Sequence, residues 1–393
     1  MANEKLSRRQ RKYINRKNNR LKKKLDFINK YNDFSILTDY YNLLESTKMA
    51  ARHVMWKISV QKFIENDLLK VYNLRSKLLK RQDIRTGFIT FPLFERGKAR
   101  TIRAVHFSER IVQKTICQKI LYPLYTHYVI EDNYANQKYK GIAYAMKRFD
   151  KSLVDYMKKN GRDGYILFID FKNYFGSIPH DKLKVMVREY ITNKDLLCYI
   201  DWFIDAYGDI GLGLGSETSQ LHGMMYPTKL DHFIKEQLGA KYYGRYMDDS
   251  YIIGKDKKEL EKILDRIVAK AKEYDITINL KKTKIKDLKH GFKYLKTRYF
   301  ITKTCKSIKR ANKYTIKHER EKLLKLINIP SIHNNEIRKD LYDWIGMSLS
   351  KNKNSRYKIW KIRDEIDAIL KTRLNPKKEI SWYKLDYIPK NFQ

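Results

Sequence analysis

The sequence has 393 residues, enough for two or three subdomains, and contains neither a signal peptide nor an apolar run long enough to span a membrane. Its three widely spaced cysteines form no metal-ligand pattern and suit a reducing compartment, so we expect a soluble cytoplasmic protein. The 84 Lys and Arg against 44 Asp and Glu give a formal net charge of +40, which disfavours a compact state unless a polyanion such as nucleic acid offsets it.

The N-terminal 30 residues carry two dense basic clusters, Arg8–Lys12 and Arg20–Lys24. Charge of this density cannot be buried, so we expect a helical arm that is either solvated or grips phosphates, and the net charge favours phosphates. Apolar residues at helical spacing between positions 35 and 80 predict two or three packed helices.

A β-hairpin is predicted where Phe88–Phe94 and Ala99–Val105 flank a turn at Glu95–Lys98. Alternation along the second strand puts Lys98 and Arg100 on one side and Arg103 on the other. These basic side chains are candidates for binding a triphosphate, although exposed basic residues are also common on edge strands. A helix at 108–121 with Ser108 as its N-cap, a loop at 133–141 and a helix at 142–158 are expected to follow.

Tyr165–Asp170 is predicted to be an apolar strand that ends on an acid. An acid at the end of a buried strand is unfavourable unless a cation or a hydrogen-bond donor meets it. Taken alone, Asp170 would more often cap a turn or a helix. A second acidic site further along the chain favours a functional role.

Residues 211–220 form a glycine-rich loop that precedes a helix running to about residue 238. Free backbone N–H groups at such a helix N-terminus can meet an anion or a template base. No Gly-Lys-Ser/Thr follows, so the loop is not a P-loop.

The stretch 241–254 is predicted to be a hairpin with Asp248 and Asp249 at its turn. Adjacent carboxylates repel each other, so such a pair is usually either solvated or bound to a cation, and Mg²⁺ combines a few carboxylates with substrate phosphates. For an Asp-Asp pair in isolation, a charged turn would be the better interpretation.

The remaining chain is predicted to form a helix at 257–274, a strand at 276–280, a hairpin at 291–300 and helices at 315–328, 336–350 and 355–372. The three last helices are basic and are expected to form a small bundle.

Several of these segments resemble, in the correct order, motifs of reverse transcriptases of the bacterial group II intron and retron-like lineage. Asp170–His180 looks like the first palm motif, and Tyr246-Met247-Asp248-Asp249 resembles the metal-binding palm hairpin. Glu95–Ile102 with Ser108–Gln113 resembles a fingers motif, and Lys140-Gly141 resembles the next fingers motif. Asn279–Ile285 resembles the Asn-x-x-Lys-Thr motif, and Phe292–Leu295 looks like the primer-grip hairpin.

The resemblance implies an α+β fold of the right-hand polymerase type, with fingers, a palm built on an antiparallel sheet, and a helical thumb. The expected divisions are a basic arm at 1–34, fingers with N-terminal helices at 35–164, palm at 165–300, and thumb with C-terminal tail at 301–393.

The implied activity is that of an RNA-directed DNA polymerase, which copies an RNA template into DNA from dNTPs with two Mg²⁺ ions, or Mn²⁺ as a substitute. In-line attack by a primer oxygen on a phosphate is stabilised by such a metal pair. Asp170 and Asp248 are expected to hold both ions, with Asp249 assisting and the carbonyl of Phe171 as a further ligand. Lys282 is implied as proton donor to pyrophosphate, with an ordinary surface lysine as an equal alternative.

Further positions follow from the resemblance alone. Nucleotide binding is implied for Lys98, Arg100, Arg103, Phe175, Gly215 and Gln220. Template or primer contact is implied for Ser219, Tyr246, Met247, Phe292 and Tyr294. Phe175 is expected to pack on the nucleotide sugar and exclude a 2′-hydroxyl; the alternative is that Phe175 is a core residue and Tyr174 faces the site.

The segment 214–220 departs from the Gln-Gly and Ser-Pro pattern of most of these enzymes and resembles the variant in diversity-generating retroelements and some phage-defence reverse transcriptases. This puts ordinary template fidelity in doubt. The expected role is bacterial or phage-encoded antiviral defence with a dedicated noncoding RNA, and a diversity-generating retroelement enzyme is the alternative. An RNA-dependent RNA polymerase is disfavoured by Phe175, and a non-catalytic RNA-binding protein by the intact acids. A homo-oligomer or an accessory protein stays open as a partner.

Overall fold

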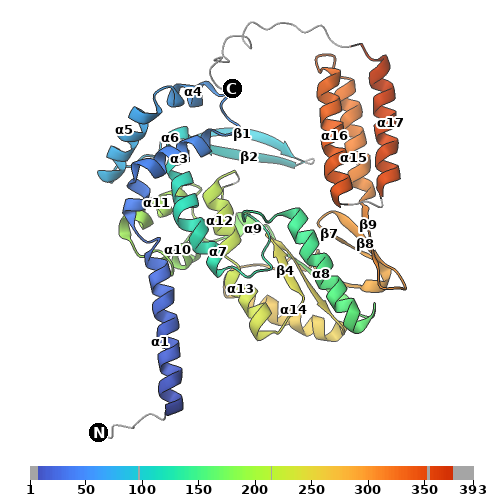
Figure 1. Cartoon of the computed structure of the whole chain (residues 1–393), viewed down its shortest axis with the longest axis horizontal. Helices are drawn as coiled ribbons and strands as arrows, with labels where there is room; N and C mark the ends of the chain where they lie inside the picture. Colours follow the sequence, from blue (N-terminus) through green and yellow to red (C-terminus); the bar gives the residue numbers. More distant parts are fainter. Residues whose placement is uncertain (1–7, 96–97, 214, 352–354, 375–393) are drawn as a thin grey trace. The chain divides into compact units, whose positions relative to one another are not determined.

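The computed structural model describes residues 8–95, 98–213, 215–351 and 355–374 (Figure 1). The chain divides into two compact units, one made of Met1–Arg148 and Leu167–Ile285, the other of Phe149–Ile166 and Lys286–Gln393. Among the residues so described, no helix is both long and apolar enough to cross a membrane.

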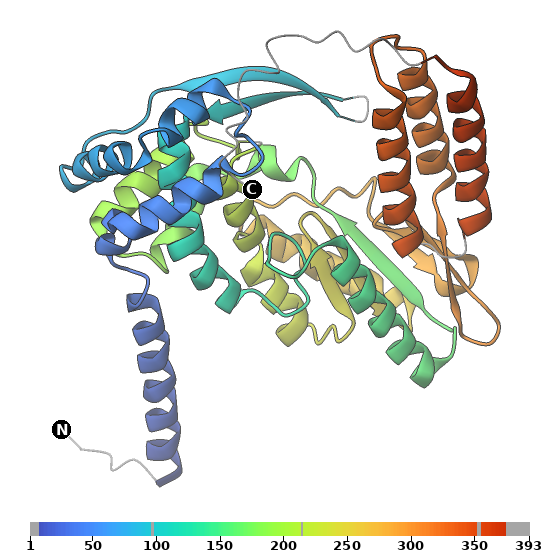
Figure 2. The same cartoon turned by 45° about the horizontal axis from the view of Figure 1, so that its top comes forward.

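The first unit begins with helix α1, which projects from the rest of its unit in both views (Figures 1 and 2). Four further helices follow where two or three were predicted: α2 Phe34–Thr38, α3 Tyr40–Ala51, α4 Ile58–Ile64 and α5 Asp67–Leu79. The extra division comes from Asp39, which ends α2 and whose side chain then accepts the N–H of Asn42 to cap α3. α1 itself spans Arg8–Asn29, and Phe27 near its end stacks on His127 with ring centroids 4.1 Å apart.

The predicted hairpin is present as β1 Phe88–Glu95 and β2 Lys98–Val105, paired antiparallel. α6 Phe107–Thr115 follows and continues into a π-helix at Ile116–Leu121 and α7 Tyr122–Tyr128. The prediction of Ser108 as N-cap is wrong, since the helix already begins at Phe107 after His106. The helix α8 spans Ile142–Asn160.

A four-stranded sheet in the order β4-β5-β3-β6 carries the acidic residues. Its strands are β3 Tyr165–Asp170, β4 Tyr243–Tyr246, β5 Asp249–Gly254 and β6 Lys284–Asp287. The helices between and after them are α9 Tyr174–Ser177, α10 His180–Arg188, α11 Lys194–Asp205, α12 Glu217–Met225, α13 Thr228–His232 with a π-helix at Phe233–Gln237, and α14 Lys257–Lys272.

The predicted strand at 276–280 is not a strand. Only Ile278 makes an isolated bridge, to Phe171, and the strand of the sheet comes later, at β6. The alternating pattern misled because the segment turns instead: the N–H groups of Lys282 and Thr283 both donate to the carbonyl of Asn279.

The second unit holds a three-stranded antiparallel sheet in the order β7-β8-β9, most of α8, and the helices that end the described chain. β7 Phe292–Tyr294 and β8 Thr297–Ile301 form the predicted hairpin, and β9 Ser307–Ala311 was not predicted. The helices α15 Lys313–Ile327, α16 Asn334–Lys351 and α17 Arg356–Thr372 lie side by side (Figure 1). Their core is apolar, with Leu323, Ile337, Leu341, Ile359 and Ile366 fully buried.

Candidate active site

The acidic pair lies at a tight turn between β4 and β5. Tyr246 pairs with Asp249, which leaves Met247 and Asp248 as the two turn residues. Met247 has a left-handed backbone with φ of 55°, a conformation that non-glycine residues adopt uncommonly. The predicted hairpin is therefore present, with Asp248 in the turn and Asp249 as the first residue of β5.

Asp170 comes next to this turn because β3 is the neighbour of β5 in the sheet. The N–H of Phe171 donates to the carbonyl oxygen of Asp248 over 3.3 Å, which ties the end of β3 to the turn. The structure thus brings together the three carboxylates that the sequence singled out, and the Phe171 peptide adjoins them.

Two side chains from the segment after α14 form hydrogen bonds to the carboxylate of Asp170. Asn279 Nδ2 donates to its Oδ1 over 2.8 Å, and Lys282 Nζ lies 3.2 Å from its Oδ2. Lys282 is largely exposed, so it also faces solvent. Asn279 received no role from sequence reasoning, although its place in the Asn-x-x-Lys-Thr motif was the signal available.

The surroundings of the acidic turn disfavour ionisation of Asp248 and Asp249. Burial raises the pKa of Asp248, and the charge of Asp170 raises it further. Desolvation raises the pKa of Asp249 to about 6, and the charges of Asp248 and Asp170 add to this shift. The side chain nevertheless keeps solvent contact. A cation would relieve this repulsion.

The donor set fits a divalent metal in its chemistry, since carboxylate and carbonyl oxygens are the ligands that Mg²⁺ prefers. Within the described ranges, no three His, Cys, Asp or Glu side chains are already arranged as ligands. The Asp170 carboxylate is instead hydrogen-bonded to Asn279 and Lys282.

Phe175 and Tyr174 have clearly different surroundings. Tyr174 is buried and its hydroxyl donates to the carbonyl of Gly223 over 2.6 Å. Phe175 is half-buried, and a Cβ added to Gly223 would lie 3.1 Å from its Cζ and 3.6 Å from Cε of Met247. Both residues belong to the short helix α9, so strand alternation does not apply to them. Tyr174 is therefore a core residue, and the role of the half-buried Phe175 toward the sugar stays a prediction.

The glycine-rich loop leads into α12, and its residues differ in exposure. Gly215, with φ of 96°, approaches β2: a Cβ there would lie 3.4 Å from Cγ2 of Ile102. Ser219 is buried in α12, whereas Gln220 is exposed and its carbonyl accepts from Asn136 Nδ2 over 3.0 Å. The expected contacts of Ser219 and Gln220 with template and nucleotide remain predictions.

The basic hairpin contributes Arg103 to a pocket of about 290 Å³, whose lining includes Thr101, Tyr207, Gly176 and Gly211. The pocket therefore joins β2 to the first residues of the glycine-rich loop and to Tyr207 before it. The side chains of Lys98 and Arg100 lie outside the described part of the structure, and their role toward a triphosphate stays a prediction.

The predicted primer-grip rings belong to the second unit. Phe292 and Tyr294 are buried on β7, where Phe292 stacks on Tyr299 with centroids 5.4 Å apart. Lys293 between them is exposed. A primer contact from this strand would therefore come from Lys293 or the backbone, with the two rings forming the support beneath. Tyr246 and Met247 are half-buried in the first unit.

Comparison with known proteins gives one finding for this arrangement. The family model described as "Reverse transcriptase (RNA-dependent DNA polymerase)" matches residues 83–299, more than half of the chain. The matched span includes β1, the acidic hairpin and the segment that holds Asp170. No curated protein matches the sequence.

Proposed function

Since the chain belongs to the reverse transcriptase (RNA-dependent DNA polymerase) family, we propose that it copies RNA into DNA by two-metal nucleotidyl transfer at Asp170, Asp248 and Asp249. Family membership makes it an RNA-directed DNA polymerase, a nucleotidyltransferase whose template is RNA, whose product is DNA and whose substrates are dNTPs. The observation that carries the catalytic assignment is the hydrogen bond from Phe171 to Asp248, which joins the two acidic segments.

When bound, two Mg²⁺ ions, or Mn²⁺ as a substitute, supply positive charge to the attacking and leaving oxygens of the in-line displacement. Asp170 and Asp248 would hold the ions, and Asp249 with the carbonyl of Phe171 would complete or orient the set. Lys282, 3.2 Å from Asp170, would give a proton to the leaving pyrophosphate, and its exposed ammonium supports this.

The chain's other residues bind the reactants. Phe175 would pack on the sugar and exclude a 2′-hydroxyl, which its position beside Gly223 and Met247 supports. Nucleotide binding is assigned to Lys98, Arg100, Arg103, Gly215 and Gln220, and template or primer contact to Tyr246, Met247 and the exposed Lys293 of β7. The buried Ser219, Phe292 and Tyr294 would support such contacts from beneath. The corresponding divisions are the arm, fingers, palm and thumb given above, with boundaries at 34, 164 and 300.

For the biological role we propose antiviral defence with a dedicated noncoding RNA as template. The variant glycine-rich loop at 214–220 supports this role, and the basic N-terminal arm supports the binding of RNA. A diversity-generating retroelement enzyme is the second candidate, because the same loop variant resembles both groups.

Single-nucleotide extension of a primer on a defined RNA template tests the polymerase function. The purified chain, given Mg²⁺ and a matched dATP, is expected to add one nucleotide, and matched ATP is expected to be used poorly. Preference for ATP would instead favour an RNA-dependent RNA polymerase. Sequencing of the nucleic acid that co-purifies with the protein tests the proposed template and role.

A further inference from the structure

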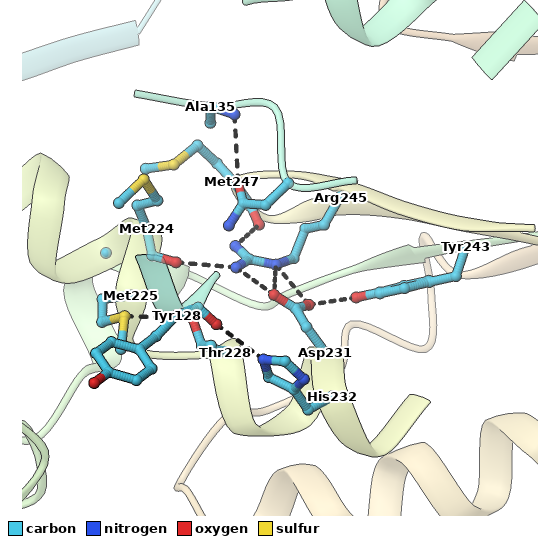
Figure 3. Close-up of polar contacts among 12 residues, drawn as sticks. Tyr128, Ala135, Met224, Met225, Thr228, Asp231, His232, Tyr243, Arg245 and Met247 are labelled. Carbon is cyan, nitrogen blue, oxygen red and sulfur yellow. Dashed lines mark hydrogen bonds and ion pairs between the residues drawn. The ribbon is translucent and has the colours of Figure 1, made fainter. Parts of the chain in front are cut away.

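Arg245 and Asp231 form an ion pair in which both side chains are completely buried (Figure 3). Arg245 Nε and Nη2 donate to the two carboxylate oxygens of Asp231 over 2.7 to 3.0 Å. The hydroxyl of Tyr243 donates to the same carboxylate over 2.6 Å. The pair is a bidentate contact between β4 and α13.

The guanidinium also reaches two backbone carbonyls on other segments. Nη2 donates to the carbonyl of Met224 in α12 over 2.9 Å, and Nη1 donates to the carbonyl of Met247 in the acidic turn over 3.0 Å (Figure 3). The backbone N–H of Arg245 donates to the carbonyl of Asp132 over 2.9 Å. One side chain therefore links the turn to α12 and α13, while its backbone links to a third segment.

Stability alone is a weak explanation for such a pair. Burying two charges costs free energy that their attraction often only offsets, and well-packed apolar residues of similar volume are commonly as stable or more so. The planar guanidinium, however, offers five donors in a fixed fork, which a lysine or an apolar side chain cannot reproduce. If an apolar pair replaced Arg245 and Asp231, the hydrogen bond to the carbonyl of Met247 would be lost. This is the bond of the guanidinium that reaches the acidic turn.

That bond acts on the peptide that leads into Asp248. Met247 has the uncommon φ of 55°, and its carbonyl oxygen is held by Arg245. The carbonyl of Asp248 is held in turn by the N–H of Phe171 over 3.3 Å. The backbone on both sides of the Asp248 side chain is thus fixed, once from β3 and once from the buried pair.

We propose that Arg245 is a positioning residue: supported by Asp231, it fixes the Met247–Asp248 peptide and thereby sets how well the acidic turn binds divalent metal and supports catalysis. This inference rests on the proposed function, because it concerns the same carboxylates. Arg245 touches no reactant itself, since its side chain is fully buried.

Three variants separate this role from a purely structural one. Arg245→Lys keeps the charge but loses the fork. The double variant Asp231→Leu with Arg245→Met removes both charges at similar volume. Tyr243→Phe is the matched control, because it removes a donor to Asp231 and leaves the bond to Met247 in place. For each variant, Tm, kcat, KM for dATP and Mn²⁺ affinity without nucleotide, measured by electron paramagnetic resonance, are compared with wild type.

The first two variants are expected to lower kcat by about 10- to 100-fold, the scale of a small misplacement of catalytic groups. They should weaken Mn²⁺ binding and leave KM for dATP within about two-fold, since a transition-state interaction is lost rather than uniform binding. Tyr243→Phe should behave like wild type in both metal binding and kcat.

Leu78→Ala, in the buried face of α5, serves as a further control for a loss of stability away from the site. A loss of kcat and Mn²⁺ affinity that Leu78→Ala reproduces at the same fall in Tm would overturn the positioning role. Wild-type kcat and Mn²⁺ affinity in a folded double variant would also overturn it. If the double variant does not fold, the kcat and Mn²⁺ affinity of Arg245→Lys provide the same test. Failure of the wild type to extend a primer counts against the proposed function, whereas the Mn²⁺ titration tests the positioning role in either case.

Discussion

The side-chain amide of Asn279 donates a 2.8 Å hydrogen bond to Oδ1 of Asp170, while the backbone N–H of Asn279 donates another, also 2.8 Å, to the carbonyl oxygen of Asp170. Asn279 therefore holds both the main chain and the carboxylate of a predicted metal ligand. Because Lys282 comes three residues later, the same turn positions the candidate proton donor.

Replacing Asn279 with alanine should lower primer extension by about 10- to 100-fold, because the Asp170 carboxylate is then free to rotate away from its productive orientation. The cost in stability should be only about 1 kcal/mol, the usual worth of one hydrogen bond. Steady-state kinetics and thermal unfolding measure the two effects. Asn335→Ala, at an exposed position of α16, is the control. Unchanged kcat in Asn279→Ala would show that Asp170 needs no such support.

Sugar choice should depend on Phe175 and not on its neighbour. Phe175→Ala is expected to admit ribonucleotides while dNTP use is partly retained, because space opens for a 2′-hydroxyl. Tyr174→Phe is the control, since it keeps the buried ring and loses only the hydrogen bond to Gly223. The ratio of kcat/KM for dATP and ATP measures the discrimination. If Phe175→Ala leaves the ratio of kcat/KM for dATP and ATP unchanged, Phe175 is not the residue that excludes ribonucleotides.

The lysines of α1 should contribute to RNA binding through phosphate contacts. Changing the exposed Lys22, Lys23 and Lys24 to glutamine should weaken RNA binding and reduce the slope of log affinity against log salt by up to about 2, since each contact to a single strand contributes about 0.7. The matched control changes the exposed Lys257, Lys258 and Lys262 of α14. Equal slopes for both triple variants would mean that the arm is a solvated helix.

Stability should depend on pH through the buried carboxyl of Glu109 in α6. Burial raises the pKa of Glu109 to about 7 in the folded protein, against 4.5 as the ordinary value, despite a hydrogen bond from Gln113. Between these pH values the unfolded chain loses the proton and the folded protein keeps it. Folding stability from this group is therefore present below pH 4.5 and lost as pH rises through about 7.

Glu109→Gln removes this titration. Its free energy of unfolding relative to wild type should therefore rise between pH 5 and pH 8, by about 1–2 kcal/mol after allowance for solvent screening. Urea unfolding at the two pH values provides the measurement. A difference between the two proteins that stays constant with pH would contradict the raised pKa.

Local sequence pattern predicted the elements that carry the acids. The apolar run ending at Asp170 is β3, and the aromatic residues around Asp248 form the β4–β5 hairpin. The bundle α15–α17 also follows from helical spacing. In each case the spacing of apolar residues within one segment indicates which face of that segment is buried, so no distant residue is needed for the prediction.

The supporting contacts could not be predicted in this way. Arg245 lies in β4 between tyrosines, and the sequence around it does not indicate that its side chain is fully buried. Its partner Asp231 belongs to another element, the helix α13. The alternation at 276–280 predicted a strand, whereas the segment turns at Asn279 to hold Asp170. Each outcome depends on a contact with another element, 14 residues away for Arg245 and Asp231 and 109 residues away for Asn279 and Asp170.

The most direct test of the central claim is primer extension by Asp248→Asn on an RNA template with Mg²⁺. A neutral amide cannot balance the charge of two divalent ions, while the strand pairing of β4 with β5 is left intact. Asp265→Asn, which changes an exposed acid on α14, is the control. We predict that Asp248→Asn abolishes extension but retains wild-type Tm and RNA affinity, and that the control extends normally. Near-normal extension by Asp248→Asn would contradict the assignment of the active site.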